Sequence, residues 1–257
     1  MLSIVVLTYG REDLLTDCLR SIDSQELPAV PIEKVIVDNG SRPPIATKPG
    51  WRIMRLEKNV GHVAGQNWCM KTAYYDWVLF VSNDVRFRHR AIRTLWKEAS
   101  TTHCSQLMPE ILWPDGRIQT GGLKELWPGY WRSVGVAQDK PHIIPSITYL
   151  LRYEAWKDVK GFDEAFIASH EDVDFGLKLR YAGFELGGVH GAEAIHLANQ
   201  TLGSDKSYNR ELFHHDRLRI IQKYHCGLDR LTRLYALKAI HSIQYGLDRV
   251  THFVRQS

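Results

Sequence analysis

Three carboxylates, Glu171, Asp172 and Asp174, lie close together in the segment 161–183, which reads GFDEAFIASHEDVDFGLKLRYAG. The apolar residues that follow them alternate with basic ones, a pattern that predicts an irregular segment turning into a helix at the carboxylates. Acidic residues at a helix start are commonly structural, because the first-turn N–H groups and the helix dipole favour negative charge. Clustered carboxylates can also accept protons or bind cations. The segment alone leaves the structural and the chemical role equally open.

A second group of polar residues follows the predicted strands of the N-terminal half. The apolar, β-branched run 3–8 predicts a buried strand, and 34–37, 51–56 and 77–81 predict three more. Ligands bind beyond the carboxyl ends of the strands in open α/β sheets. Singly, each polar residue there is more often a turn residue than a ligand, but together they indicate one binding site: Thr8, Tyr9, Asp38, Asn39, Ser82, Asn83 and Asp84.

Helical patterns separate these strands. Apolar residues recur at three- and four-residue spacing over 11–22, and a second helix follows the loop 59–67. The alternation predicts an α/β fold with a Rossmann-like mixed, mostly parallel sheet flanked by helices. The phosphate-binding patterns GxGxxG and GxxxxGK(S/T) are absent, which argues against a dinucleotide-dependent oxidoreductase and against a P-loop enzyme.

The composition is that of an ordinary globular chain, with 257 residues, 44% hydrophobic and 24% charged, and a formal charge of +4. No apolar run approaches the roughly 18 residues of a membrane span, and the apolar opening lacks the basic start and cleavage site of a signal peptide. Four scattered cysteines predict buried free thiols in a reducing compartment. We therefore expect a cytoplasmic protein, at most peripheral at the inner face of a membrane.

The region after residue 203 differs from the rest of the chain. Its apolar residues recur only at helical spacing, with a break near Gly227, which predicts a helical C-terminal extension over 204–257. About ten Lys or Arg against five Asp or Glu place the whole positive surplus there. We expect this region to pack on the catalytic domain, to form a homodimer or to lie on an anionic membrane. The strand ends are acidic, so no nucleic-acid partner is expected.

Eight segments in this order resemble the family-2 glycosyltransferases, particularly their rhamnosyltransferase-like branch. They are IVVLTYGR, IVDNGS, NVGHVAGQN, FVSNDV, GRIQTGG, YLLRYEAWKDVKGFDEAF, HEDVDFGLKLRYAG and AIHLANQT. The resemblance covers about residues 2–202 and implies a GT-A fold that binds a nucleotide-diphospho-sugar. It implies a catalytic domain over 1–203, with a nucleotide-binding half (1–100) and an acceptor-binding half (101–203).

The resemblance also implies a nucleotide-sugar site. Thr8 and Tyr9 would line the pocket for the base and ribose, and Asp38 would accept hydrogen bonds from them. The glycines of the loop 59–67 would let the backbone approach the nucleotide closely. The other residues of the predicted nucleotide-sugar site are Arg11, Asn39, Gly61, Gly65, Asn67, Ser82, Asn83 and Asp84.

The family places a DxD metal site after the fourth strand, where this chain has Ser82-Asn83-Asp84. The remaining carboxylate, Asp84, would bind Mn²⁺ or Mg²⁺ together with diphosphate oxygens and water. His196 matches a histidine that is common in the family and would be a further ligand, which favours Mn²⁺. A lone histidine after an apolar strand is otherwise usually structural.

The chemistry that the resemblance implies is an inverting sugar transfer. Asp172 corresponds to the general base of the family, which takes the proton of the attacking hydroxyl, and Glu171 would orient the acceptor or assist Asp172. Aromatic residues on loops commonly stack on sugars, although they are equally suited to filling a small satellite core. The acceptor, a glycan or lipid-linked glycan, is therefore expected at Trp113, Trp127, Trp131 and His170.

Two other functions fit parts of the pattern. A sugar nucleotidyltransferase needs a basic, glycine-rich loop near its start, and residues 8–11 contain only one glycine. A catalytically silent module that binds sugar nucleotides or glycans would fit the reduced Ser82-Asn83-Asp84 motif, although the Glu171-Asp172 pair argues against it. No single residue decides whether the donor is of the UDP or the dTDP type.

Overall fold

The computed structural model describes residues 1–135, 141–167, 169–197 and 206–256. The chain divides into two compact units. The larger unit comprises Met1–Lys124, Ser133–Ile167 and Glu171–Leu202, and the smaller unit comprises Glu125–Arg132, Ala168–His170 and Gly203–Ser257.

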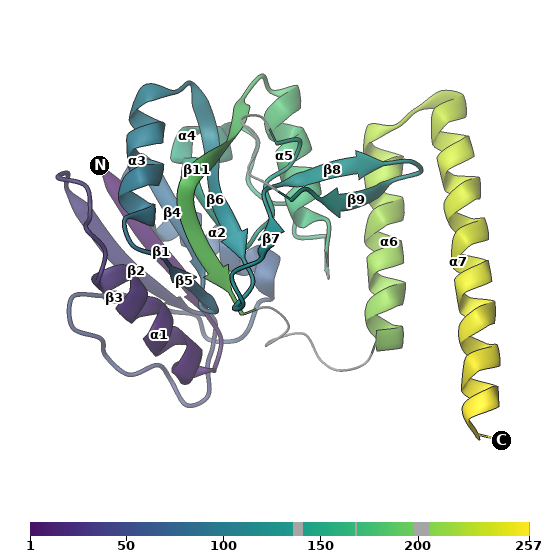
Figure 1. Cartoon of the computed structure of the whole chain (residues 1–257), viewed down its shortest axis with the longest axis horizontal. Coiled ribbons are helices and arrows are strands. Elements are labelled where there is room, and N and C mark those ends of the chain that lie inside the picture. The colour runs from purple at the N-terminus through teal and green to yellow at the C-terminus, as the bar shows by residue number, and fades with distance from the viewer. Residues whose placement is uncertain (136–140, 168, 198–205, 257) are drawn as a thin grey trace. The chain divides into compact units, whose positions relative to one another are not determined.

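A mixed sheet of nine strands forms the centre of the larger unit (Figure 1). Across the sheet the strand order is β3-β2-β1-β4-β10-β6-β11-β5, and β7 pairs with β6. The four strands from β3 to β4 are parallel, and β10 is antiparallel to both of its neighbours. The strands are β1 (Leu2–Thr8), β2 (Ile32–Asp38), β3 (Arg52–Arg55), β4 (Trp77–Ser82), β5 (Val85–Phe87), β6 (Cys104–Leu112), β7 (Ile118–Thr120), β10 (Thr148–Arg152) and β11 (Glu185–His196).

The parallel strands form where the sequence is most continuously apolar. All seven residues of β1 are buried, as are the first five residues of β4, so helices cover both faces of these strands. The four strands predicted in the N-terminal half are confirmed. Their carboxyl ends meet at one edge of the sheet, because β1 is parallel to both β2 and β4.

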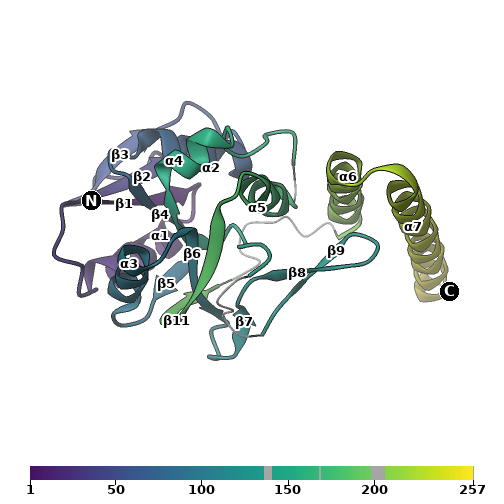
Figure 2. The ribbon, with the colours of Figure 1, turned by 90° about the horizontal axis from the view of Figure 1, so that it is seen from above.

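Helices lie on both faces of this sheet (Figure 2). On one face lie α1 (Glu12–Asp23) and α3 (Ala91–Thr101), and on the other lie α2 (His62–Thr72) and α4 (Tyr153–Asp158). The predicted apolar stripe of α1 is confirmed, since its five buried residues are Leu14, Leu15, Cys18, Leu19 and Ile22. The helix α5 (Glu171–Tyr181) packs against β11 and begins at the predicted carboxylates.

The smaller unit contains a pair of helices and residues Glu125–Arg132 of a β-hairpin. The helices α6 (Lys206–Tyr224) and α7 (Gly227–Gln256) run side by side and are separated at the predicted break (Figures 1 and 2). The strands β8 (Leu123–Leu126) and β9 (Tyr130–Ser133) form the hairpin, whose Glu125 lies 2.7 Å from Arg233 of α7. None of the helices in the described ranges is both long enough and apolar enough to cross a membrane.

The cysteines are free, as predicted, but not all of them are buried. Cys18, Cys69 and Cys104 lie in the core of the larger unit, whereas Cys226 is exposed. The prediction was wrong for Cys226 because this residue lies in the short break between α6 and α7, not on the apolar face of either helix.

Candidate active site

The carboxyl edge of the parallel strands brings the predicted residues of the first, second and fourth strands together. Thr8 at the end of β1 is in register with Asp38 at the end of β2, and Leu7 is in register with Ser82 at the end of β4. Asn83 then donates a hydrogen bond from Nδ2 to Oγ1 of Thr8 (2.9 Å). Three segments that are distant in sequence therefore meet at one edge.

Two of the predicted nucleotide-binding side chains at this edge are already engaged with the protein. Asp38 is fully buried, accepts the N–H of Ser41 (2.8 Å) and forms an ion pair with Arg55. Asn39 accepts the N–H of Val60 (2.9 Å) and donates to the carbonyl of Gly61 (3.1 Å). These contacts shape the loops that follow β2 and β3.

Tyr9 and Arg11 lie at the start of the β1–α1 connection. Tyr9 is 46% exposed, so part of this residue is accessible to a ligand. Arg11 has a left-handed backbone (φ 45°) and binds Asp13 at 2.9 Å. The Asp13 partner, with a smaller contribution from the charge of Asp84, raises the pKa of Arg11.

The helix α2 approaches the sheet closely at the predicted glycines. A Cβ atom on Gly65 would lie 2.9 Å from Cδ2 of Leu7, so α2 packs closely on the Leu7 side chain of β1 at this glycine. Gly61 precedes α2 with φ 86°, a backbone conformation that favours glycine. Asn67 is buried, and its side chain contacts Trp156 of α4 and Phe162 beyond that helix. In this structure Asn67 joins α2 to that segment.

Asp84 and His196 lie together at the far end of the same edge. Nε2 of His196 is 3.3 Å from Oδ2 of Asp84, and the carbonyl of Asp84 accepts the N–H of Leu197 (3.0 Å). Nδ1 of His196 lies 3.1 Å from Oε1 of Gln119. Oε1 of Gln119 can accept a proton from Nδ1, and a cation between His196 and Asp84 would then take the Nε2 lone pair; without a cation, a hydrogen bond from Nε2 to the Asp84 carboxylate needs a proton on Nε2.

A carboxylate beside an imidazole acceptor is a donor set that fits a divalent cation such as Mn²⁺. The Gln119 contact is the kind of outer-shell hydrogen bond that orients a metal-binding histidine. Among the described residues, no group of three or more His, Cys, Asp or Glu is arranged to hold a metal. A cation here would therefore need additional oxygen ligands from a bound substrate or from water.

Glu171 and Asp172 occupy the first turn of α5. Burial, followed by the charge of neighbouring Glu171, raises the pKa of Asp172 to about 7. Asp172 is only partly buried and remains accessible to solvent. A carboxylate with this pKa is partly ionised at neutral pH and is suited to taking up a proton.

His62, the first residue of α2, carried no prediction from the sequence. His62 is exposed to solvent; neighbouring protein atoms lower its pKa, and the charges of Asp84 and Asp172 oppose this shift. The charges of both carboxylates therefore act on the pKa of His62. Its place directly after Gly61 in the helix-entry loop is the only sequence signal that could have drawn attention to it.

The residues predicted to bind the acceptor fall in different units. Trp113 is half-buried and follows β6 in the larger unit, whereas Trp127 and Trp131 belong to the hairpin part of the smaller unit. His170 is also in the smaller unit, where burial and then the charge of Arg217 lower its pKa to about 4.

The fold and this edge define a class of protein. An α/β sheet of this order with acidic residues beyond its parallel strands is the GT-A architecture of nucleotide-sugar-dependent glycosyltransferases. The model of glycosyl transferase family 2 matches residues 3–151. The chain belongs to this family, and the resemblance read from the sequence is confirmed.

Similar proteins agree with this assignment. An uncharacterized glycosyltransferase, YwdF of Bacillus subtilis, is 33% identical over 105 residues, which cover 39% of this chain and 38% of that protein. The N-acetylglucosaminyl-diphospho-decaprenol L-rhamnosyltransferase of Mycobacterium tuberculosis is 25% identical over 281 residues, covering 93% of this chain and 89% of that protein.

A solved structure supports the fold. The structure of TarS residues 1–349 from S. aureus in complex with UDP-GlcNAc matches with a TM-score of 0.61 and 20% identity. The match covers 90% of this chain and 69% of that one.

Proposed function

We propose that this chain is an inverting glycosyltransferase that moves a sugar from a nucleotide-diphospho-sugar to a hydroxyl of a glycan or lipid-linked glycan. The observation that carries the proposal is the 3.3 Å approach of His196 to Asp84, at the sheet edge where nucleotide diphosphates bind in this architecture. The family assignment and the rhamnosyltransferase named above support it.

The roles of the residues follow from their surroundings. Asp84 and His196 would hold Mn²⁺ or Mg²⁺ with the diphosphate. A cation bound there would neutralise the negative charge that develops on the departing diphosphate. Asp172 would accept the proton of the attacking hydroxyl, because its raised pKa makes it a stronger base than an ordinary carboxylate. Thr8, Tyr9 and the loop after Asp38 would surround the base and ribose.

Calorimetric titration tests this proposal most directly. The protein would be titrated with UDP, dTDP and GDP, each with and without Mn²⁺, and the titrations repeated on Asp84→Ala. We expect one uracil or thymine nucleotide to bind more tightly with metal, and we expect the metal effect to disappear in the variant. Asp115→Ala, which removes an exposed carboxylate outside the site, is the control. If no nucleotide binds, the transferase proposal is wrong and a glycan-binding module becomes the better account.

For the C-terminal helices we propose contact with an anionic membrane surface that holds a lipid-linked acceptor. Within the smaller unit, apolar side chains are exposed on the hairpin, at Leu126 and Trp127, and along one side of α7, at Leu228, Leu231 and Tyr235. The ion pair between Glu125 and Arg233 joins the two elements. Tryptophan and tyrosine suit the interface between water and lipid, and the region carries the positive surplus of the chain.

Vesicle co-sedimentation tests the membrane proposal. We expect the protein to bind phosphatidylglycerol-containing vesicles more strongly than phosphatidylcholine vesicles, and we expect Trp127→Ser with Tyr235→Ser to weaken binding. Tyr74→Ser is the matched control, because Tyr74 is 84% exposed in the larger unit. A wild-type protein that ignores vesicles and is dimeric in solution, but becomes monomeric in the double variant, would assign these side chains to a homodimer interface instead.

A further inference from the structure

Asp216 of α6 is a fully buried carboxylate that holds the backbone just before α5. Its Oδ2 accepts the N–H of Ser169 (3.1 Å), and its Oδ1 lies 3.4 Å from Nδ1 of His215. All three residues belong to the smaller unit. A buried carboxylate is costly unless it is hydrogen-bonded, because it has lost its hydration. The bond to Ser169 therefore helps to stabilise Asp216, and it ties the backbone at residue 169 to α6.

The residue between this hydrogen bond and α5 has an unusual backbone. His170 has φ 63°, a left-handed conformation that residues other than glycine rarely adopt. The hydroxyl of Ser169 lies 2.6 Å from Nδ1 of the same histidine. A residue keeps such a conformation only where its surroundings impose it. The hydrogen bond from the neighbouring Ser169 N–H to Asp216 is a contact of this kind.

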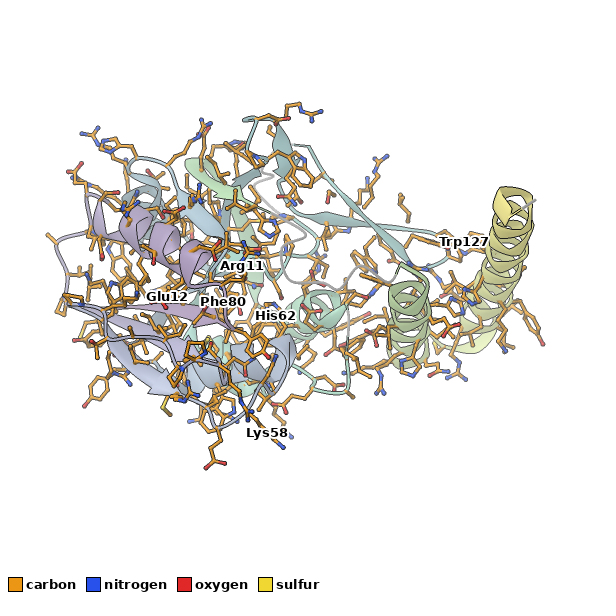
Figure 3. All side chains as sticks on the ribbon, turned by 90° about the horizontal axis from the view of Figure 1, so that it is seen from below. Arg11, Glu12, Lys58, His62, Phe80 and Trp127 are labelled. Carbon is orange, nitrogen blue, oxygen red and sulfur yellow. The ribbon has the colours of Figure 1, made fainter. Side chains whose placement is uncertain are left out.

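The helix α6 is itself held within the smaller unit by the elements beside it. His214 stacks on His241 of α7, with ring centroids 4.0 Å apart, and Figure 3 shows side chains between these two helices. The guanidinium of Arg217 lies 3.9 Å from the ring centroid of Tyr130 in the hairpin. Because α7 and the hairpin both hold α6, Asp216 gives the backbone at residue 169 a fixed point of attachment.

Asp172 lies only three residues after this point of attachment. The peptide bond between His170 and Glu171 joins the smaller unit to α5 of the larger unit, and Asp172 lies in the first turn of that helix. The first N–H groups of a helix have no partner within the helix, so its first turn is less constrained than its interior. The position of this turn therefore depends on the segment that leads into it.

We infer that Asp216 is a positioning residue for Asp172: by holding the backbone of Ser169, it fixes where the first turn of α5 begins. This inference rests on the proposed function, in which Asp172 takes the proton of the attacking hydroxyl. A base must lie within hydrogen-bond reach of that proton, so a displacement of about 1 Å would slow the reaction strongly. Nucleotide binding would be unaffected. The C-terminal extension then takes part in the reaction itself, besides the membrane contact proposed above.

The test compares Asp216→Ala with Asp216→Asn. Alanine removes the acceptor for the Ser169 N–H, whereas asparagine keeps an oxygen that can accept it but has no charge. The control is Leu237→Ala, because Leu237 is fully buried in α7 of the same unit. This change leaves a cavity in the smaller unit but keeps the carboxylate that binds Ser169.

Three quantities are measured on the full chain of each variant and of the wild type. They are the affinities for UDP and dTDP with Mn²⁺, the rate of acceptor-free hydrolysis of saturating UDP-GlcNAc or dTDP-L-rhamnose, and the amide hydrogen exchange of residues 169–176. In the hydrolysis, water replaces the acceptor hydroxyl and Asp172 would take its proton. The exchange reports on the lead-in segment and the first turn of α5 without any need for turnover.

We expect Asp216→Ala to lower the hydrolysis rate by about 10- to 100-fold and to speed exchange of residues 169–176 by about 10-fold, with nucleotide affinity unchanged. Asp216→Asn should show smaller changes in the same direction, and Leu237→Ala should hydrolyse as the wild type does. If Asp216→Ala does not fold, Asp216→Asn is judged by the same three quantities.

Three results would overturn the inference. The first is unchanged exchange of residues 169–176 in Asp216→Ala, and the second is wild-type hydrolysis by this variant. The third is an equal loss of hydrolysis in Leu237→Ala, which would mean that only the stability of the smaller unit matters. A wild type that binds neither nucleotide would instead overturn the proposed function.

Discussion

Asn67 and Phe162 exchange two hydrogen bonds, much as two neighbouring strands do. The N–H of Phe162 donates to Oδ1 of Asn67 (2.9 Å), and Nδ2 of Asn67 donates to the carbonyl of Phe162 (3.0 Å). Oδ1 also accepts from Nε1 of Trp156 (3.2 Å), and Nδ2 also donates to Glu164 (2.9 Å). The side-chain amide of Asn67 thus joins α2 to α4 and to the segment after α4.

Asn67→Ala should therefore destabilise the fold rather than weaken nucleotide binding selectively. It leaves the N–H and carbonyl of Phe162 without their partner, for an expected loss of about 2–4 kcal/mol in the free energy of unfolding. Urea denaturation measures this loss, with Lys71→Ala, an exposed change on the same helix, as the control. If Asn67→Ala unfolds like the wild type yet no longer binds nucleotide, the contact with the nucleotide predicted from the sequence would be the better account.

Gln119 should control metal binding without touching the metal. Gln119→Leu removes the acceptor for Nδ1 of His196, so that the ring can rotate or adopt the other tautomer. We expect the enhancement of nucleotide binding by Mn²⁺ to require about 10-fold more metal, whereas nucleotide affinity without metal stays unchanged. Gln119→Glu keeps an acceptor and should behave more like the wild type. Equal metal dependence in Gln119→Leu and the wild type would argue against His196 as a ligand.

The pH dependence of the reaction should report the ionisation of Asp172. Its pKa is raised by burial and then by Glu171, and only the ionised form can accept a proton. We expect kcat/KM to rise with pH to a plateau, with a midpoint near 7. Glu171→Gln should move this midpoint to lower pH, because it removes a negative charge that disfavours ionisation. A midpoint that is the same in both proteins would mean that another group controls the rate.

Asp172 should also destabilise the fold in a pH-dependent way. Its pKa is higher in the folded protein than in the unfolded chain, so the folded state disfavours the ionised form. The loss of folding stability that Asp172 causes is absent below the unfolded pKa of about 3.8, grows as pH rises, and reaches its full size above about pH 7. Asp172→Asn should therefore melt at a higher temperature than the wild type at pH 8, with a smaller difference at pH 5. Calorimetric scans at both pH values measure this, and a difference that is constant with pH would contradict it.

The sequence was informative wherever burial imposes a local pattern. The runs that become β1 and β4 are almost continuously apolar because helices cover both faces, and the stripe of α1 has the spacing of a buried helix face. The position of β10 in the sheet could not be predicted in this way. A short apolar strand looks the same at any place in a sheet, and its place depends on pairing with β4 and β6, which are distant in sequence.

The candidate site was only partly predictable for a similar reason. Polar residues after strands could be placed at one edge, because parallel strands end together. Which side chains stay available for a ligand depends on neighbours that only the fold supplies: Asp38 binds Arg55, and Asn67 binds Phe162. His62 gave no motif of its own, since its surroundings come from β4, Ser146 and the two carboxylates. The functional roles of these site residues stay predictions.

The strand order has a consequence for how the chain reaches its native state. The central strand β10 lies between β4 and β6 but follows both of them in the chain. Until residue 152 has been synthesised, β4 and β6 each present an unpaired, apolar edge to the cell. The strands β1 and β2 are close in sequence and can pair early, whereas β10 pairs with strands that are more distant in the chain. A nascent chain that ends between β6 and β10 therefore exposes strand edges that can aggregate and that chaperones would protect.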